Sequence, residues 1–325
     1  MVGLRHVART RTRLALRAAL RFIPDRAFLP LRTSFSMTAP ASPLHSLQRS
    51  LLQAARYRGV PYEIDSFVLI DNNSVRLSNA DSFIVEWLYW FGEQNGYEAA
   101  VIHWWKRFCA ASSHIVEFGS NIGYYIVQGA PMAPDAHYMA VEPHPGCADL
   151  CRRNIELNGI TNAEVVEAAA VPELSSPTVA LLLPGGRDHY VDAPCGGFVG
   201  VNDVHDSNED RRSFSTVTVP AVATSSLIGP LTDLIKMDVE GQEHSLLVAM
   251  LAQLKAARPT IFVELLDTTP HLRTLILEEL LPAGYQAFVP TKQALVPLST
   301  ADIASVSTFR DFGTRDIILT TRQIG

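Results

Sequence analysis

The chain has 325 residues, of which 47% are hydrophobic and 18% are charged. An apolar fraction of this size can form a packed core, which excludes a wholly disordered chain. Charge is unevenly distributed: residues 1–62 hold 11 Arg, no Lys and one acid, a net charge of +10, whereas residues 63–325 carry −16. The acidic part argues against a nucleic-acid binder, because phosphate contacts require Lys and Arg.

The basic leader comes first in the chain. Residues 4–22 are Arg-rich and almost free of acids, with the spacing of a basic amphipathic helix. Such a segment suits a membrane-surface helix, an organelle transit peptide, or sequence upstream of a true start at Met37. Pro24–Pro43 holds four prolines, so we interpret residues 1–43 as a mobile, non-catalytic leader (1–36) and linker.

Cysteine spacing and hydropathy bear on the compartment. The four cysteines form no Cys-x-x-Cys pair, and Cys147 and Cys151 lack the nearby His or Cys of a zinc site. This usage suits a reducing cytosol. No apolar run approaches the roughly 20 residues that cross a bilayer. We therefore expect a cytoplasmic protein without a transmembrane segment or a zinc site.

Residues 44–112 carry a mixed pattern, which we interpret as an N-terminal helical and hairpin cap that packs against the next domain. Leu repeats at helical spacing, the turn Asp71–Asn73 separates two short alternating runs, and two helical stretches follow. The expected elements are a helix at 44–58, strands at 62–70 and 75–77, and helices at about 80–91 and 97–111.

From residue 113 to 325 the chain alternates short apolar runs with helical stretches, which is typical of an α/β domain with helices on both faces of a parallel sheet. The expected strands are 114–118, 137–141, 163–167, 234–238, 260–264, 284–289 and 315–320. The expected helices are about 122–130, 146–158, 241–256 and 270–281. Such sheets bind ligands outside the carboxyl ends of their strands, so the residues after each strand are the functional candidates.

The first of these strands ends in a glycine loop, Gly119 to Gly123. A dinucleotide loop would have a glycine in place of Asn121 and a third glycine, and a P-loop would have Gly-Lys-Ser/Thr. The loop favours a nucleoside ligand without phosphates, although a plain strand-to-helix turn has a similar sequence. Glu142 lies 23 residues after Gly119, where an acid binds ribose hydroxyls; a capping role is its alternative.

Charged residues gather around the fourth and fifth strands. Alternation puts Lys236 and Asp238 on one face of an apolar strand, where mutual pairing would offset the cost of burial. If the two strands are neighbours, Asp238, Glu240 and Glu264 converge on one edge of the sheet. Carboxylates so placed act as a general base or hold a divalent ion, and Glu240 alternatively caps the next helix.

A polar insertion with five glycines occupies residues 184–214. Loops of this length are uncommon in compact domains unless they are functional or disordered. We expect either a lid over the acceptor, contacted through Arg187, His189 and Tyr190, or a disordered surface loop.

Four blocks of sequence stand out in order: 115–127 (IVEFGSNIGYYIV), 138–171 (beginning YMAVEPHPG), 233–247 (DLIKMDVEGQEHSLL) and 259–265 (PTIFVEL). They resemble the FkbM-type S-adenosylmethionine-dependent methyltransferases, over about residues 91–320. The resemblance implies a Rossmann-like class I methyltransferase fold, a doubly wound, mostly parallel sheet of seven strands with the last strand antiparallel. It also implies methylation of a hydroxyl oxygen on a sugar, glycolipid or secondary metabolite.

The resemblance also implies, by position, which residues bind S-adenosylmethionine. Gly119, Asn121 and Gly123 would surround its methionine part, and Glu142 would bind the ribose hydroxyls. The adenine would lie near Pro143, Glu167 and Ala168, while Asp238 and Glu240 would face the methyl group. The chain departs from the family pattern at Glu117 and Ser120, where the family usually has Asp and Ala. We nevertheless assign both residues to the cofactor-binding site. The chain departs again at Thr224–Leu227, where the family has a Leu-Asp pair.

Methyl transfer to oxygen needs a hydroxyl held in line with the methyl group and a base for its proton. Our hypothesis assigns the base, or the orientation of the hydroxyl, to Asp238, with His244 or Glu264 as helpers. The expected partner is a small-molecule or glycan acceptor, and a divalent metal is an option that the sequence does not require. Two other classes stay open: a nicotinamide-dependent oxidoreductase and a methyltransferase-like binding module without activity.

Overall fold

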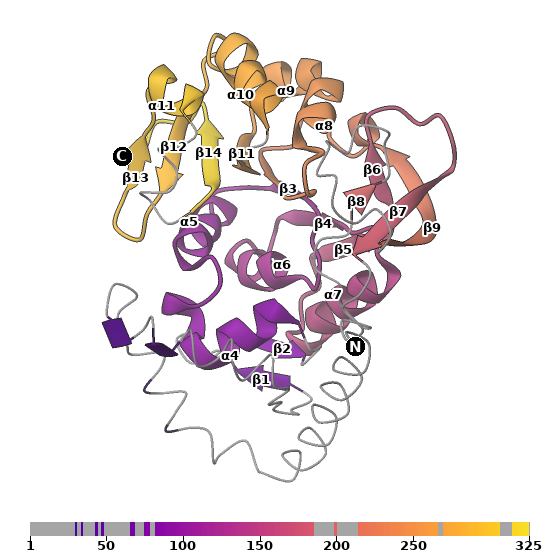
Figure 1. The fold of residues 1–325 in the computed structure, drawn as a ribbon, viewed down its shortest axis with the longest axis vertical. Helices are drawn as coiled ribbons and strands as arrows, with labels where there is room; N and C mark the ends of the chain where they lie inside the picture. Colours follow the sequence, from indigo (N-terminus) through magenta and orange to yellow (C-terminus); the bar gives the residue numbers. More distant parts are fainter. Residues whose placement is uncertain are drawn as a thin grey trace, which may run out of the picture. The chain divides into compact units, whose positions relative to one another are not determined.

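The computed structural model describes residues 82–184, 214–265, 269–305 and 314–324, the short stretches 66–68, 75–78 and 198–199, and a few positions before residue 50. The chain divides into two compact units, Met1–Ala99 and Ala100–Gly325 (Figure 1). The predicted leader and linker and the helix at 44–58 lie almost entirely outside the described residues, as does most of the 184–214 insertion.

The described part of the first unit includes the predicted hairpin and the helix that follows it. Strands β1 (Ser66–Val68) and β2 (Arg76–Ser78) pair antiparallel, which confirms the hairpin. Helix α4 (Phe83–Asn95) begins where the hydroxyl of Ser82 accepts a hydrogen bond from the backbone N–H of Ile84, at 3.2 Å. It is interrupted at Gly92, whose φ of 69° lies outside the helical range.

The second unit is built on a large, mostly parallel sheet. In the part of the chain that the structure describes, this sheet has eight strands in the order β13-β12-β14-β11-β10-β3-β4-β5. The strands are β3 (His114–Phe118), β4 (His137–Val141), β5 (Ala163–Val166), β10 (Leu234–Met237), β11 (Thr260–Glu264), β12 (Gln286–Pro290), β13 (Leu295–Pro297) and β14 (Asp316–Thr320). The last strand, β14, runs antiparallel between β11 and β12, as expected.

The expectation of seven strands was wrong by one. The additional strand, β13, pairs antiparallel with β12 after a tight turn, in which the hydroxyl of Thr291 donates a hydrogen bond to the carbonyl of Ala294 at 2.7 Å. β13 has only three residues and ends in proline, which cannot donate to a strand ladder. Its sequence therefore carries little strand signal.

Helices connect the strands of the second unit. They are α5 (Ala99–Cys109), α6 (Tyr124–Gly129), α7 (Pro145–Leu157), α8 (Glu243–Ala249), α9 (Leu251–Ala257), α10 (Pro270–Leu275) with a π-helical extension (Ile276–Leu280), and α11 (Thr300–Ala304); short 3₁₀ turns lie at Ala130–Met132 and Thr224–Ser226. The single helix expected at 241–256 is two helices separated at Met250, whose φ of −110° departs from helical geometry. Among the described residues, every helix falls short of the length and apolarity needed to cross a membrane.

Helix α5 packs on one face of the large sheet, although its sequence was assigned to the N-terminal cap. Trp105 is fully buried, with its ring 5.2 Å from that of Phe262 and 5.6 Å from that of Tyr125, both edge to face. Its indole N–H donates to the carbonyl of Tyr125 at 3.1 Å. Because this large aromatic side chain is buried against β11 and α6, α5 belongs to the second unit and the division falls at residue 99, not 112.

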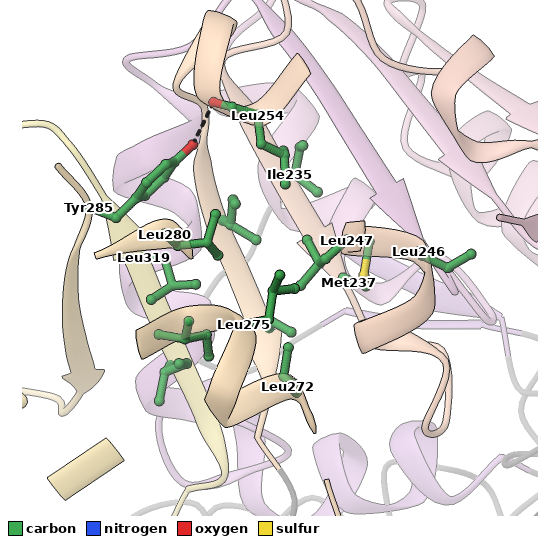
Figure 2. Close-up of a cluster of buried hydrophobic side chains, with 14 of the residues drawn as sticks. Ile235, Met237, Leu246, Leu247, Leu254, Leu272, Leu275, Leu280, Tyr285 and Leu319 are labelled. Atoms are coloured by element: carbon green, nitrogen blue, oxygen red, sulfur yellow. Dashed lines mark hydrogen bonds between the residues drawn. The ribbon is translucent and has the colours of Figure 1, made fainter. Parts of the chain in front are cut away.

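The opposite face of the sheet carries the main aliphatic core. Figure 2 shows side chains of β10, β14, α8, α9 and α10 converging there: Ile235, Met237, Leu246, Leu247, Leu254, Leu272, Leu275, Leu280 and Leu319. Tyr285 closes this core, and its hydroxyl donates to the carbonyl of Leu254 at 3.1 Å (Figure 2). Helices on both faces confirm the doubly wound α/β class.

The described residues form a further sheet that the sequence did not predict. Its strands are β6 (Ala169–Val171), β7 (Thr178–Pro184), β8 (Phe198–Val199) and β9 (Phe214–Ala223), in the order β6-β9-β7-β8 (Figure 1). β7 and β9 pair antiparallel from Thr178↔Pro220 to Pro184↔Phe214, so the two ends of the polar insertion lie side by side. The predicted lid itself, residues 185–213, lies outside the described residues except for β8.

Candidate functional site

The functional candidates lie along one edge of the large sheet, where the parallel strands end. Strand register places one residue of each of five neighbouring strands or strand ends in a single row: Glu142, Gly119, Asp238, Glu264 and Asp316. Two residues earlier on their strands, Glu117 and Lys236 pair directly and face the same side of the sheet. Four carboxylates and one glycine therefore share this edge. The buried side chains of Glu117 and Lys236 lie two residues below it on their strands.

Gly119 brings two loops into close backbone contact. Its φ is +78°, and an added Cβ would lie 1.8 Å from the carbonyl oxygen of Asp238, so only glycine fits. The contact is fixed from both sides. The N–H of Gly119 donates to the carbonyl of Val141 at 2.9 Å, and the N–H of Asp238 donates to the carbonyl of Phe118 at 3.1 Å.

The rest of the glycine loop turns into helix α6. Asn121 and Gly123 both have positive φ, 49° and 82°, and Gly123 directly precedes the helix. A Cβ on Gly123 would approach the sulfur of Cys151 to 2.7 Å, so this glycine also allows α6 and α7 to pack closely. Ser120 is buried within the loop. The loop is thus a tight backbone turn.

Glu142 is bound to the glycine loop. It is buried, and its Oε2 accepts a hydrogen bond from the N–H of Asn121 at 2.7 Å, while Oε1 accepts from the N–H of His144 at 2.8 Å. Burial raises the pKa of Glu142 to about 7, although these two bonds oppose the shift. Each carboxylate oxygen has a second lone pair, so Glu142 can still accept hydrogen bonds from a diol.

The positions expected around an adenine follow β4 and β5. Pro143 lies between Glu142 and His144, the residue that caps α7 by accepting a hydrogen bond at Nδ1 from the N–H of Cys147. Glu167 is engaged by an ion pair with Arg152 of α7, at 2.8 Å, and Ala168 is buried beside it. Pro143 is half-buried and Ala168 is buried, while the carboxylate of Glu167 is held at a partly exposed position.

Lys236 and Asp238 form the pair predicted for them. Lys236 is only 2% exposed, its Nζ lies 3.1 Å from Oδ2 of Asp238, and it also lies 4.2 Å from the centre of the Tyr125 ring. Beside it, Glu117 accepts a hydrogen bond from the hydroxyl of Tyr138. Burial raises the pKa of Glu117 to about 7, against the opposing effects of Lys236 and Tyr138. Lys236 therefore compensates the negative charge of the buried Glu117 as well as that of the partly exposed Asp238.

Glu264 lies opposite Asp316 on the neighbouring strand, which brings two acids together. Burial raises the pKa of Glu264 to about 8, and the negative charges of Asp238, Asp316 and Glu240 add to the shift. The guanidinium of Arg315 reaches Glu264 only at 3.9 Å and is mostly exposed. Asp316 is buried, and the hydroxyl of Thr314 donates to it at 3.1 Å.

Two of the predicted residues stand apart from this row. Glu240 is exposed, with a left-handed backbone (φ 52°), and helix α8 begins three residues later, so the alternative that Glu240 caps this helix was wrong. His244 packs its ring 5.6 Å from that of His271 of α10. Burial, and then the charge of His271, lower the pKa of His244.

The sequence missed Glu243, the first residue of α8. It is fully buried, and its Oε1 accepts hydrogen bonds from the N–H groups of Val239 and Gly241, each at 3.1 Å. An acid in the first turn of a helix is common, so the sequence gives no sign that this one folds back over the preceding loop.

Metal ligation is a separate question, because clustered carboxylates can hold divalent ions. Within the described ranges, no three His, Cys, Asp or Glu side chains are arranged to hold a metal ion.

The Methyltransferase FkbM domain profile matches residues 117–286, just over half of the chain. Methyltransferase 1 of Beauveria bassiana is 24% identical over 169 residues, which are 50% of this chain and 68% of that protein. Among solved structures, the methyltransferase FkbM of Methylobacillus flagellatus has a TM-score of 0.36 at 13% identity over 64% of this chain, which spans 43% of that one. M. jannaschii TYW2 in complex with AdoMet has a TM-score of 0.36 at 12% identity, covering 76% and 80%. Because the FkbM domain profile matches more than half of the chain, the chain belongs to the FkbM family of S-adenosylmethionine-dependent methyltransferases.

Proposed function

We propose that this protein binds S-adenosylmethionine and transfers its methyl group to a hydroxyl oxygen of a small-molecule or glycan acceptor. The acceptor classes that fit the family resemblance are a sugar, a glycolipid and a secondary metabolite. The observation that carries the proposal is the row of carboxylates at the sheet edge. Across the strands, Asp238 lies next to Gly119 of the glycine loop, and Glu264 lies next to Asp238.

The residues around the glycine loop fit this cofactor. Glu142 retains carboxylate lone pairs for a ribose diol, and Gly119 leaves the loop backbone open to close approach. Asn121 stands where a dinucleotide loop would need glycine, which disfavours the nicotinamide alternative. When bound, S-adenosylmethionine supplies a methyl group on a positively charged sulfur. Neighbouring carboxylates favour a cation at this edge of the sheet.

Asp238 and Glu264 have different tasks in this account. Asp238, whose charge Lys236 compensates, accepts a hydrogen bond from the acceptor hydroxyl and orients its oxygen. Glu264, in its ionised form, would take the proton as the new oxygen–carbon bond replaces the bond from that carbon to sulfur. The ionised form of a carboxyl whose pKa is about 8 is a stronger base than an ordinary carboxylate, and its share increases as the pH approaches 8. Holding the oxygen about 3 Å from the methyl carbon, in line, supplies much of the acceleration.

The cytoplasm is the compartment that we propose. Cys109, Cys147 and Cys151 are free thiols buried in the second unit, which suits a reducing environment.

Calorimetry and labelled-methyl transfer together test the proposal. We expect S-adenosylmethionine and S-adenosylhomocysteine to bind near micromolar affinity and NAD not to bind. An extract of the source organism, and then a panel of sugars and glycolipids, should yield a labelled ether. Binding without transfer to any acceptor would instead identify a non-catalytic binding module, and binding of NAD alone would overturn the proposal.

A further inference from the structure

We infer that Glu243 is a positioning residue, whose carboxylate fixes the peptide between Asp238 and Val239 and so sets the shape of the catalytic edge. This inference rests on the proposed function, because it concerns the loop that carries Asp238. No described hydrogen bond joins the side chain of Glu243 to Asp238 or Gly119. Glu243 acts through the N–H of Val239, which belongs to the same peptide group as the carbonyl of Asp238.

The loop after β10 contains a strained backbone at Glu240. Glu240 and Gly241 are consecutive residues with left-handed backbones, at φ 52° and 95°. Glycine adopts this conformation readily, whereas glutamate does so at an energetic cost. Something must hold the loop in this shape, and the N–H groups on either side of Glu240 both donate to Oε1 of Glu243 at 3.1 Å.

A charge-assisted hydrogen bond in a buried position is stronger than one in water. The side chain of Glu243 is fully buried, and its oxygen accepts from two backbone donors. These bonds offset part of the cost of burying the carboxylate, as the effect on its pKa shows: burial raises it and the backbone bonds lower it. The two N–H groups are thus tied to the start of helix α8.

The planarity of the peptide bond carries the effect to the glycine loop. The N–H of Val239 and the carbonyl of Asp238 belong to one peptide group, so fixing the N–H fixes the direction of the carbonyl. That carbonyl oxygen is the atom that lies against Gly119, 1.8 Å from where a Cβ would stand. Glu243 therefore holds one side of a peptide whose other side faces the cofactor loop.

Three variants of Glu243 test whether its hydrogen-bonding oxygen holds the loop after β10. Glu243→Gln keeps an oxygen that can accept both N–H bonds, Glu243→Ala removes it, and Glu243→Asp withdraws it by one methylene group. The matched control is Asp302→Ala: Asp302 also accepts a backbone hydrogen bond at a helix start, from the N–H of Ser299 at 2.8 Å, but in α11.

Hydrogen exchange of the peptide covering residues 238–242 is the primary measurement, and it needs no acceptor. We expect exchange there to be at least about tenfold faster in Glu243→Ala and Glu243→Asp, and near wild type in Glu243→Gln and Asp302→Ala. Unchanged exchange in Glu243→Ala and Glu243→Asp would overturn the inference. If Glu243→Ala does not fold, the Asp and Gln variants decide the same question.

Steady-state kinetics then test whether the conformation of the loop that carries Asp238 affects the rate of methyl transfer. We expect kcat to fall about 10- to 100-fold in Glu243→Ala and less than about threefold in Glu243→Gln, at an acceptor KM that changes less than kcat. A Glu243→Gln enzyme as impaired as Glu243→Ala would mean that charge, not the hydrogen-bonding oxygen, is required, and would contradict the inference. A wild-type protein without transferase activity would instead count against the proposed function. The hydrogen-exchange measurement would still test whether Glu243 holds the loop, because it does not depend on activity.

Discussion

The carbonyl oxygen of Asp238 lies 1.8 Å from the point where a Cβ on Gly119 would stand. This contact joins the glycine loop after β3 to the loop after β10. It explains why glycine is required at position 119 without reference to any ligand, and it gives the first of the predictions.

Gly119→Ala should destabilise the protein by more than about 3 kcal/mol, because the new methyl group collides with backbone and the residue is also strained at φ +78°. Gly159→Ala is the matched control, since Gly159 has φ +64° but open space around it. Its cost should be about 1 kcal/mol, from backbone strain alone. Urea denaturation compares the two variants, and equal losses would contradict the collision.

Glu142→Ala should weaken binding of S-adenosylhomocysteine by about tenfold or more, because it removes both the acceptor for a ribose diol and the bonds that hold Asn121 and His144. Glu164→Ala serves as control: this exposed acid of β5 pairs with His137. Calorimetry should find its affinity within about threefold of wild type. Equal losses in both variants would remove Glu142 from the cofactor site.

Stability should fall as pH rises from about 4.5 to about 8. In the native state burial and neighbouring acids raise the pKa of Glu264 from 4.5 to about 8, so the folded protein binds more protons than the unfolded chain across this window. Glu117 and Glu142, raised to about 7, act in the same direction. Urea midpoints measured at pH 5, 6, 7 and 8 check this. Glu264→Gln should reduce the dependence of the urea midpoint on pH between about 7 and 8. A wild-type midpoint that increases with pH would contradict the prediction.

Lys236→Met should destabilise the protein by about 3 kcal/mol, because it removes a cation from buried acids. Lys236 pairs with Asp238 and lowers the pKa of Glu117 and Asp316. The control, Lys255→Met, breaks an exposed pair with Glu279 and should cost less than about 1 kcal/mol. Denaturation at pH 8, where the acids are most charged, gives the largest contrast; a Lys236→Met protein as stable as the control would contradict the assignment.

Much of the fold could be predicted from the sequence because its strands are short apolar runs separated by helices. The predicted strands 114–118, 137–141 and 260–264 coincide with β3, β4 and β11. Periodicity alone could not find β13, a three-residue strand ending in Pro297, or the pairing of β7 with β9 across the polar insertion. Both depend on contacts between segments, and so does the placement of α5, which Trp105 determines by packing on the sheet.

The candidate site divides in the same way. The placement of Glu142, Asp238 and Glu264 at one edge could be predicted because the carboxyl ends of parallel strands meet there, and their roles stay predictions. Glu243 was missed because its role depends on the left-handed backbones of Glu240 and Gly241, which turn the loop back over α8. A sequence reveals an acid after a strand, but it does not reveal which backbone groups that acid will meet.

Labelled-methyl transfer by wild type and by Asp238→Asn decides whether this edge of the sheet performs methyl transfer to oxygen. We predict that wild type forms a base-stable methyl ether with its acceptor. Asp238→Asn should lose about 100-fold in turnover, because an uncharged amide replaces the charged acceptor that orients the hydroxyl, while binding S-adenosylhomocysteine within a few-fold of wild type. Turnover of Asp238→Asn at the wild-type rate would contradict the account.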